Sequence, residues 1–370
     1  MDEVDFDFIS LKRRYSGLDI FRVVSALIVC MFHTTIHLGC NYGIFQSVSM
    51  MGAVFMTAFF MLSGFSLFIN WGGVSLTGNH EIIKFWKKRI LGIMPIYWLV
   101  SLVYVLVMIV VGRETVIRTI VLAPVEILGL QTVYHSLFEV SHNGGTWFIS
   151  CILICYALYP FLQELIKNLS FRIRVILLIL CAAILLYSPF IVYLYKTEWI
   201  YSNPFFRMLE FSIGILIATM KADIDRKHIV FLYKWWLILL EAVLMFEGIT
   251  IAVKLGIAVG DYMLYSWVCL PCFIFILLGL SGIESRVLNE SKLLKWMADI
   301  SFAFFLAQLF SNEICGVLIE QFSIESNIMK IFLGWIICII IAVFIHFIEM
   351  SLNRFTKRYN FRDRNDNLQS

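Results

Sequence analysis

Apolar residues gather along the chain into eleven long runs separated by short polar segments. A helix needs about 20 apolar residues to cross the hydrocarbon core of a bilayer, which is roughly 30 Å thick. The runs cover residues 18–38, 48–69, 90–111, 116–137, 146–166, 172–194, 204–220, 229–252, 262–283, 293–315 and 329–350. This pattern predicts an all-α, polytopic membrane protein.

The fourth run, 116–137, differs from the others because it contains Arg118, Pro124, Glu126 and His135. Ionisable side chains are costly inside a bilayer. We therefore interpret this run as an extra, partly embedded segment. The remaining ten runs are predicted to cross the membrane.

The distribution of basic residues supports ten crossings with both termini in the cytoplasm. In that arrangement the inside segments contain 21 Lys and Arg residues and the outside segments contain 4, as the positive-inside rule requires. An eleventh crossing would invert every segment after the fourth run. The predicted organisation is a cytoplasmic N-terminal segment (1–17), a ten-helix membrane domain (18–350) and a basic cytoplasmic tail (351–370).

Composition excludes a soluble domain: 61% of the residues are apolar and only 15% are charged, against roughly 25% charged in soluble domains. The acidic start, MDEVDFDFIS, lacks the basic stretch of a cleaved signal peptide. The nine cysteines fall almost entirely within apolar runs, without zinc-type spacing or a disulfide framework. We expect membrane lipids as partners and no nucleic acid; the oligomeric state is left open.

Four polar residues mark one stripe of the first predicted helix: Asp19, Arg22, His33 and His37. Eleven residues at 100° each bring His33 to within about 20° of Arg22 around the helix and about 16 Å along it. His33 and His37 are one turn apart, and Asp19 is placed to pair with Arg22. Such a stripe is predicted to face a polar cavity inside the bundle.

An imidazole in such a cavity is suited to general-base catalysis, because it can take a proton from a hydroxyl at neutral pH. His33 is therefore the predicted catalytic residue. The alternative is a buried histidine that is hydrogen bonded to a neighbouring carbonyl, and this alternative is favoured for His37. The HTTIH spacing has no accompanying carboxylate or third ligand, so no metal site is predicted.

A second polar cluster lies in KFWKKRILGIMPIYW, where Lys87, Lys88 and Arg89 precede the third apolar run. Two interpretations stay open: anchoring by the positive-inside rule, or binding of the phosphate groups of a cytosolic ligand. Elsewhere, Arg207 and Glu210 are one turn apart and predicted to form an internal ion pair. Glu349 is predicted to pair with a basic neighbour such as Arg354.

Seven phrases of the sequence, in order, resemble those of the acyltransferase 3 family of integral membrane acyltransferases. They are GLDIFRVVSALIVCMFH, FMTAFFMLSGFSLF, KKRILGIMPIYW, TWFISCILICYALYP, RMLEFSIGILIA, ADISFAFFLAQ and FIEMSLNRF. The resemblance covers roughly residues 14–358. Two departures stand out: Gly92 occupies the position of the family's second arginine, and Gln308 replaces a late histidine. The sequence resembles the family's shorter branch, which has no fused esterase-like domain.

The resemblance implies a multi-pass enzyme of the bacterial inner or plasma membrane that transfers an acyl group other than aminoacyl, commonly acetyl. The donor is cytosolic acyl-CoA, and the acceptor is a hydroxyl of a cell-envelope or exported glycan. In this interpretation His33 activates the acceptor hydroxyl, and Arg22, Lys88 and Arg89 bind acyl-CoA. The residues assigned to the acceptor side are His37, His142, Asn143 and Trp147, although Trp147 is equally explained as an interface anchor.

The same interpretation gives structural roles to Asp19, Arg207, Glu210 and Glu349. The main rival is a glycan-precursor transporter or flippase, which would also need many helices and buried charge. The absence of an internal repeat and the Arg22/His33 stripe count against it. The second rival is a membrane receptor or assembly scaffold without catalytic activity.

Overall fold

The structure is a computed structural model, and it describes residues 14–110, 112–134, 137, 144–196, 200–226, 230–256, 266–283 and 285–366. The elements are α2 (Ser16–Leu38), η1 (Gly43–Phe45), α3 (Gln46–Met50), η2 (Gly52–Phe55), α4 (Met56–Trp71), α5 (Asn79–Val110), α6 (Val116–Leu128), η3 (Gly144–Thr146), α8 (Trp147–Lys167), α9 (Phe171–Tyr195), α10 (Pro204–Arg226), η4 (Val230–Tyr233), α11 (Trp235–Lys254), α12 (Ser266–Ser281), α13 (Arg286–Glu290), α14 (Lys292–Gln321) and α15 (Asn327–Asp366). Every regular element in these ranges is helical, so the predicted all-α class is confirmed there.

Eight helices in the described ranges are long and apolar enough to cross a membrane: α2, η2 with α4, α5, α8, α9, α11, α14 and α15. The two other predicted crossings correspond to α10 and to the shorter apolar helix α12. The count of ten and the orientation of the termini stay predictions. The predicted tail is not separate from the last span, because α15 continues through it to Asp366.

The fourth apolar run forms α6, a helix of 13 residues. At 1.5 Å per residue it is about 20 Å long, too short to cross a bilayer. The Tyr97 hydroxyl of α5 donates a hydrogen bond to the Glu126 carbonyl over 2.6 Å, and Trp98 Nε1 donates to the Ile127 carbonyl over 2.7 Å. These bonds fasten α6 beside α5; that the segment is partly embedded stays a prediction.

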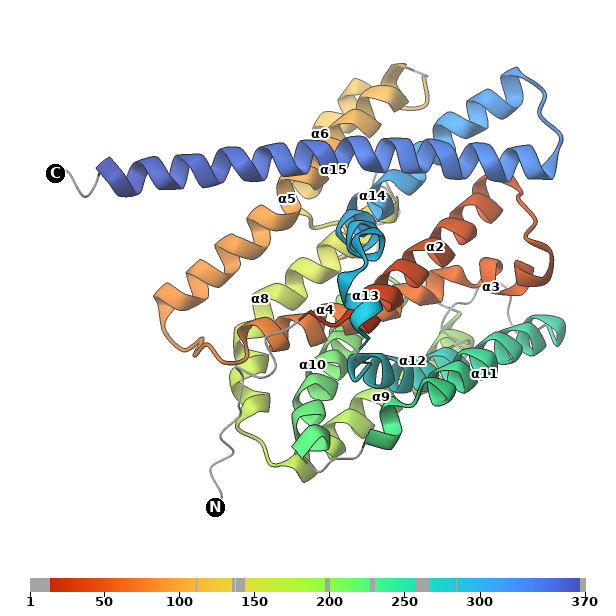
Figure 1. Cartoon of the computed structure of the whole chain (residues 1–370). Helices are drawn as coiled ribbons and strands as arrows, with labels where there is room; N and C mark the ends of the chain where they lie inside the picture. Colours follow the sequence, from red (N-terminus) through yellow and green to blue (C-terminus); the bar gives the residue numbers. More distant parts are fainter. Residues whose placement is uncertain are drawn as a thin grey trace.

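Helix α4 forms the centre of the bundle. In the apolar stretch made by η2 and α4, 83% of the residues are buried by other parts of the protein. Its most extensive contact is with α10 (Figure 1). The two backbones meet at Gly64 and Gly214, where neither residue has space for a side chain. Glycine at both positions therefore allows the two helix backbones to pack closely together.

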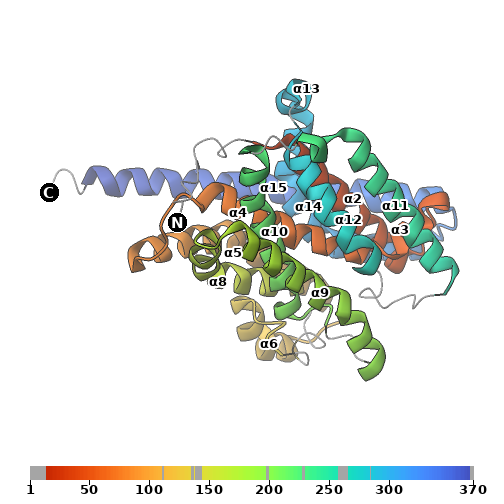
Figure 2. The same cartoon turned by 90° about the horizontal axis from the view of Figure 1, so that it is seen from below.

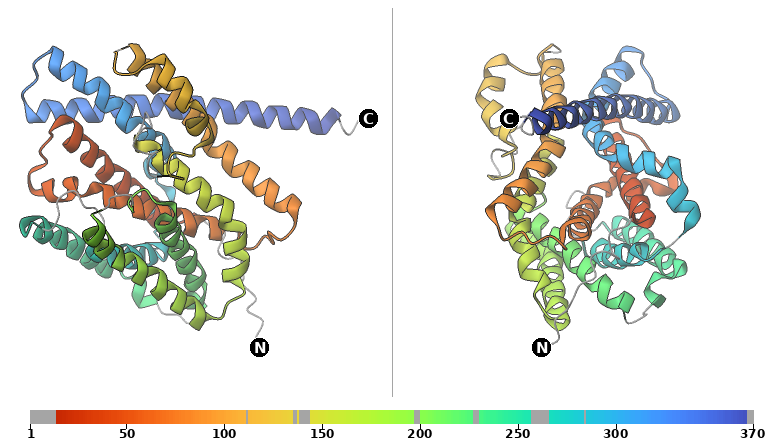
Figure 3. Two further views of the ribbon diagram at one scale, coloured as in Figure 1. Left: turned by 180° about the vertical axis from the view of Figure 1, so that it is seen from behind. Right: turned by 60° about the vertical axis from the view of Figure 1, so that its left-hand side comes forward.

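Helix α2 packs against α14, α4, α12, α15 and the segment from α3 to η2. In Figures 1 and 3, α6 and α15 lie on one side of the bundle, α9, α10, α11 and α12 lie toward the opposite side, and α2 and α4 lie between them. The C-terminal part of α15 extends beyond the other helices (Figure 2). Of the polar stripe, Asp19, Arg22 and His33 are half-buried and His37 is exposed.

Candidate functional site

One unbroken helix carries the polar stripe. Helix α2 runs from Ser16 to Leu38 and ends at Gly39, whose φ of 65° lets its backbone N–H bond to the Thr34 carbonyl. Because the helix is continuous, Arg22 and His33 remain about 16 Å apart along one face. The site therefore has two ends joined by a rigid element.

The Arg22 end borders a cavity of about 380 Å³ between α2 and α4. Its polar lining includes Arg14, Asp19, Arg22, Ser66 and Asn70. Asp19 accepts a 2.7 Å bond from Arg14 Nε, and the Arg22 guanidinium lies 3.8 Å from the Asp19 carboxylate. The predicted Asp19–Arg22 pair is thus the longer of two contacts, and two guanidinium groups share one carboxylate. The cavity keeps an excess of positive charge.

The basic cluster of α5 lies against the end of α4. Lys88 Nζ is 5.3 Å from the centre of the Trp71 ring, and Arg89 Cζ is 5.8 Å from the same ring. Lys87 and Lys88 are exposed, whereas Arg89 is half-buried. Gly92, where the family pattern has arginine, is exposed, and a Cβ added there would meet no atom within 4 Å.

A tyrosine of α8 connects the two groups of basic residues. The Tyr156 phenol lies against the Ser63 side chain of α4 and within electrostatic range of both Arg89 and Arg22. Four helices, α2, α4, α5 and α8, therefore contribute to one polar region. Sequence reasoning did not assign Tyr156 or Ser63 to the site; the only available signal was the presence of Ser63 in the Leu-Ser-Gly-Phe phrase.

The other end of the stripe holds two stacked imidazoles. The His33 and His37 rings are nearly parallel, with centres 5.7 Å apart, and Phe32 packs edge-on against His33 at 5.2 Å. His33 Nδ1 is buried, and no hydrogen-bond partner for it is found in the described part of the chain. His37 is exposed. A nitrogen that is shielded but unpaired is available to a ligand hydroxyl.

The turn that follows α2 closes this end. Tyr42 Oη lies 2.7 Å from Thr34 Oγ1 and accepts a 2.7 Å bond from Trp335 Nε1 of α15. Burial raises the pKa of the neighbouring Cys40 thiol to about 11, so this thiol stays protonated at neutral pH and is a poor nucleophile. Across the described ranges, no group of three His, Cys, Asp or Glu residues is placed to hold a metal ion.

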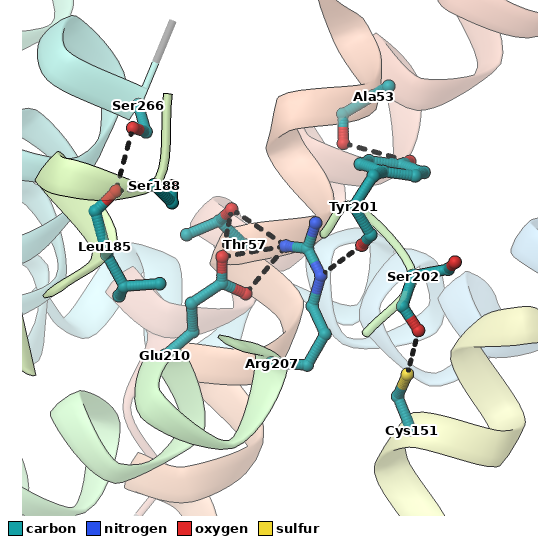
Figure 4. Close-up of polar contacts among 10 residues, drawn as sticks. All are labelled: Ala53, Thr57, Cys151, Leu185, Ser188, Tyr201, Ser202, Arg207, Glu210 and Ser266. Atoms are coloured by element: carbon teal, nitrogen blue, oxygen red, sulfur yellow. Dashed lines mark hydrogen bonds and ion pairs between the residues drawn. The ribbon is translucent and has the colours of Figure 1, made fainter. Parts of the chain in front are cut away.

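Trp147 and the Arg207–Glu210 pair lie together in the interior. Arg207 Nη1 donates to both carboxylate oxygens of Glu210 over 2.7 and 2.8 Å, and Nε donates to the Tyr201 carbonyl over 2.7 Å (Figure 4). Thr57 of α4 donates to Glu210 over 2.9 Å. This network fastens α10 to α4.

The Trp147 ring is buried and lies 5.2 Å from the Arg207 guanidinium. Its surroundings fit a cation–π contact and not an anchor at the membrane surface. Glu349 lies 3.3 Å from His346 Nδ1; the side chain of Arg354, its predicted partner, is outside the described residues, as are His142 and Asn143.

Comparison with known proteins gives one finding. A family model described as an acyltransferase domain matches residues 15–347. No curated protein and no solved structure matches the chain. Because the match covers most of the sequence, from just before Arg22 to the last membrane helix, the chain belongs to the acyltransferase 3 family and is a multi-pass membrane acyltransferase.

Proposed function

We propose that the protein is an O-acyltransferase that moves an acyl group, acetyl foremost, from cytosolic acyl-CoA to a hydroxyl of a cell-surface or exported glycan. The observation that carries this proposal is the single helix α2, which borders a basic cavity at Arg22 and presents a shielded, unpaired imidazole nitrogen at His33. We propose residues 18–350 as the catalytic domain and the bacterial inner or plasma membrane as its location.

In this proposal the donor enters at the basic end. The phosphates of acyl-CoA bind Arg22, Lys88 and Arg89, whose charges suit phosphate oxygens. The pantetheine arm then extends along the α2 stripe past Tyr156. The separation of about 16 Å between Arg22 and His33 is comparable to the reach that such an arm needs.

The transfer step takes place at His33. The acceptor hydroxyl oxygen attacks the thioester carbonyl while the imidazole takes the hydroxyl proton. The carbon–sulfur bond then breaks, the ester forms, and the imidazole returns the proton to the CoA thiolate. Protons and electrons balance without a further reactant. His37 and Trp147 are proposed on the acceptor side, and no metal is required.

The experiment is an assay in isolated membranes with labelled acetyl-CoA and surface glycan that has been stripped of its esters by mild alkali. We expect the wild-type protein to label the glycan and His33→Ala to abolish the labelling. His80→Ala is the matched control, because His80 is an exposed histidine at the start of α5. Equal labelling by His33→Ala, or glycan that crosses the bilayer without acquiring label, would contradict the proposal.

A further inference from the structure

The cavity of about 380 Å³ between α2 and α4 is bordered by one guanidinium to which the proposed function assigns no role. It belongs to Arg14, which lines the cavity together with Arg22 and the Asp19 carboxylate. The Arg14 side chain is 33% exposed. A cation that borders a cavity of ligand size and is accessible to solvent is available to a bound anion.

Two hydrogen bonds hold the Arg14 side chain beside this cavity. Its Nε donates to Asp19 Oδ2 over 2.7 Å, and its Nη1 donates to the Asn289 carbonyl of the α13 helix over 3.4 Å. A guanidinium has five N–H groups, and these bonds use two of them. Arg14 therefore has a defined position from which further N–H groups can reach a ligand.

Arg14 and Arg22 lie close to each other because they share one carboxylate. Arg14 contacts Oδ2 of Asp19, whereas Arg22 Nη1 lies 3.8 Å from Oδ1, a distance too long for a hydrogen bond. Two positive charges therefore face one negative charge in the cavity. This arrangement suits two phosphate groups that are attached to the same small molecule, because each guanidinium can bind one of them.

The rest of the cavity wall is suited to a flat, apolar group. It includes the side chains of Leu18 and Ile69 and the rings of Tyr15 and Phe65. The Tyr15 ring packs edge-on against Phe65 with centres 6.1 Å apart, and Lys221 Nζ lies 5.6 Å from the centre of the Tyr15 ring. An apolar wall beside two guanidinium groups matches a nucleotide, which combines a flat base with charged phosphates.

We infer that Arg14 binds the 3′-phosphate of the acyl-CoA donor, while Arg22 binds the diphosphate. This inference rests on the proposed function, because it subdivides the donor site. Arg22 lies on the stripe that leads to His33, so it is the cation beside the diphosphate, to which the pantetheine arm is attached. Arg14 precedes Ser16, the first residue of α2, and faces the phosphate at the far side of the ribose. Arg14 thus sets the preference for CoA over its 3′-dephospho form.

The test measures the dissociation constants of CoA and of 3′-dephospho-CoA by titration calorimetry on the full chain in detergent, without any glycan. We expect the wild-type protein to bind CoA about tenfold more tightly, the effect of a charge-assisted contact with the additional phosphate. Arg14→Gln should weaken the binding of CoA about tenfold and leave that of 3′-dephospho-CoA unchanged, which also shows that the variant is folded. Arg14→Lys keeps the charge without the planar fork and should retain part of the preference.

Two other cations serve as controls. Arg286→Gln removes an arginine of α13 that is 89% exposed and should change neither dissociation constant, whereas Lys88→Gln should weaken both by the same factor, because both ligands carry the diphosphate.

Three results would overturn the inference: equal binding of the two ligands by the wild-type protein, equal weakening of both in Arg14→Gln, or loss of the preference in either control. Equal binding is also the result expected if the cavity holds a phospholipid headgroup, and it leaves the proposed function standing. A wild-type protein that binds neither ligand refutes the proposed donor, and this inference with it.

Discussion

Replacement of Gly64 by alanine tests the close contact between α4 and α10. A Cβ atom at Gly64 would lie 1.9 Å from the Phe211 carbonyl oxygen, and one at Gly214 would lie 1.9 Å from the Met61 carbonyl oxygen. Both obstacles are backbone atoms of the partner helix, so no side chain can rotate away. The methyl group therefore forces α4 and α10 apart.

The magnitude follows from that distance. An ordinary contact of about 3.4 Å requires the helices to separate by roughly 1.5 Å, and gaps of 0.5–1 Å already remove about a quarter to a half of the dispersion energy of the affected atoms. Overpacking of a core costs about 1–3 kcal/mol, and alanine returns at most about 1 kcal/mol of helix propensity. Because the whole α4–α10 interface is affected, we expect Gly64→Ala to lower the free energy of unfolding by about 3 kcal/mol.

Equilibrium unfolding in mixed detergent micelles, followed by circular dichroism, measures this loss. Gly316→Ala is the control, because a Cβ at that helical position meets no atom within 4 Å. One separation relieves both clashes, so the double variant Gly64→Ala, Gly214→Ala should cost less than the sum of the two single changes. Wild-type stability in Gly64→Ala, or strictly additive costs, would refute the reasoning.

Three further predictions concern other parts of the chain. Arg207→Met leaves Glu210 buried without its cation and should lower the free energy of unfolding by about 3–5 kcal/mol in the same assay; adding Glu210→Met should recover part of the loss. Gly92→Arg places a second guanidinium one turn beyond Arg89 in open space and should lower the KM for acetyl-CoA about fivefold; an unchanged KM would argue against donor binding there. Tyr97→Phe removes the 2.6 Å bond to α6 and should speed hydrogen exchange in α6 at a cost of about 1 kcal/mol.

The helices could be predicted from hydropathy because membrane spans need long apolar runs. The run 172–194 became Phe171–Tyr195. The predicted boundaries were less accurate where polar residues continue a helix. Helix α5 begins at Asn79, eleven residues before the predicted apolar run, because the helix also includes the polar residues from Lys84 to Arg89. The run 48–69 is interrupted, since residues 46–55 contain the short helices α3 and η2 before α4 begins at Met56.

The candidate site was predictable only within one helix. Helical periodicity relates Arg22 to His33, but it does not show that Arg14 shares Asp19 or that Tyr156 lies within electrostatic range of both Arg22 and Arg89. Those contacts depend on how distant helices pack. The environment of Trp147 could not be predicted from the sequence either, because a tryptophan side chain is suited both to a membrane surface and to contact with a buried cation.

The α4–α10 contact also has a consequence for biosynthesis. Gly64 and Gly214 are about 150 residues apart in the chain, so a ribosome that adds about 5–20 residues per second makes α10 roughly 8–30 s after α4. Until then the central helix lacks its main neighbour, and its glycine-lined groove faces lipid or the insertion machinery. Nascent chains released before residue 204 cannot complete the bundle, and cellular proteases should recognise them as unfinished.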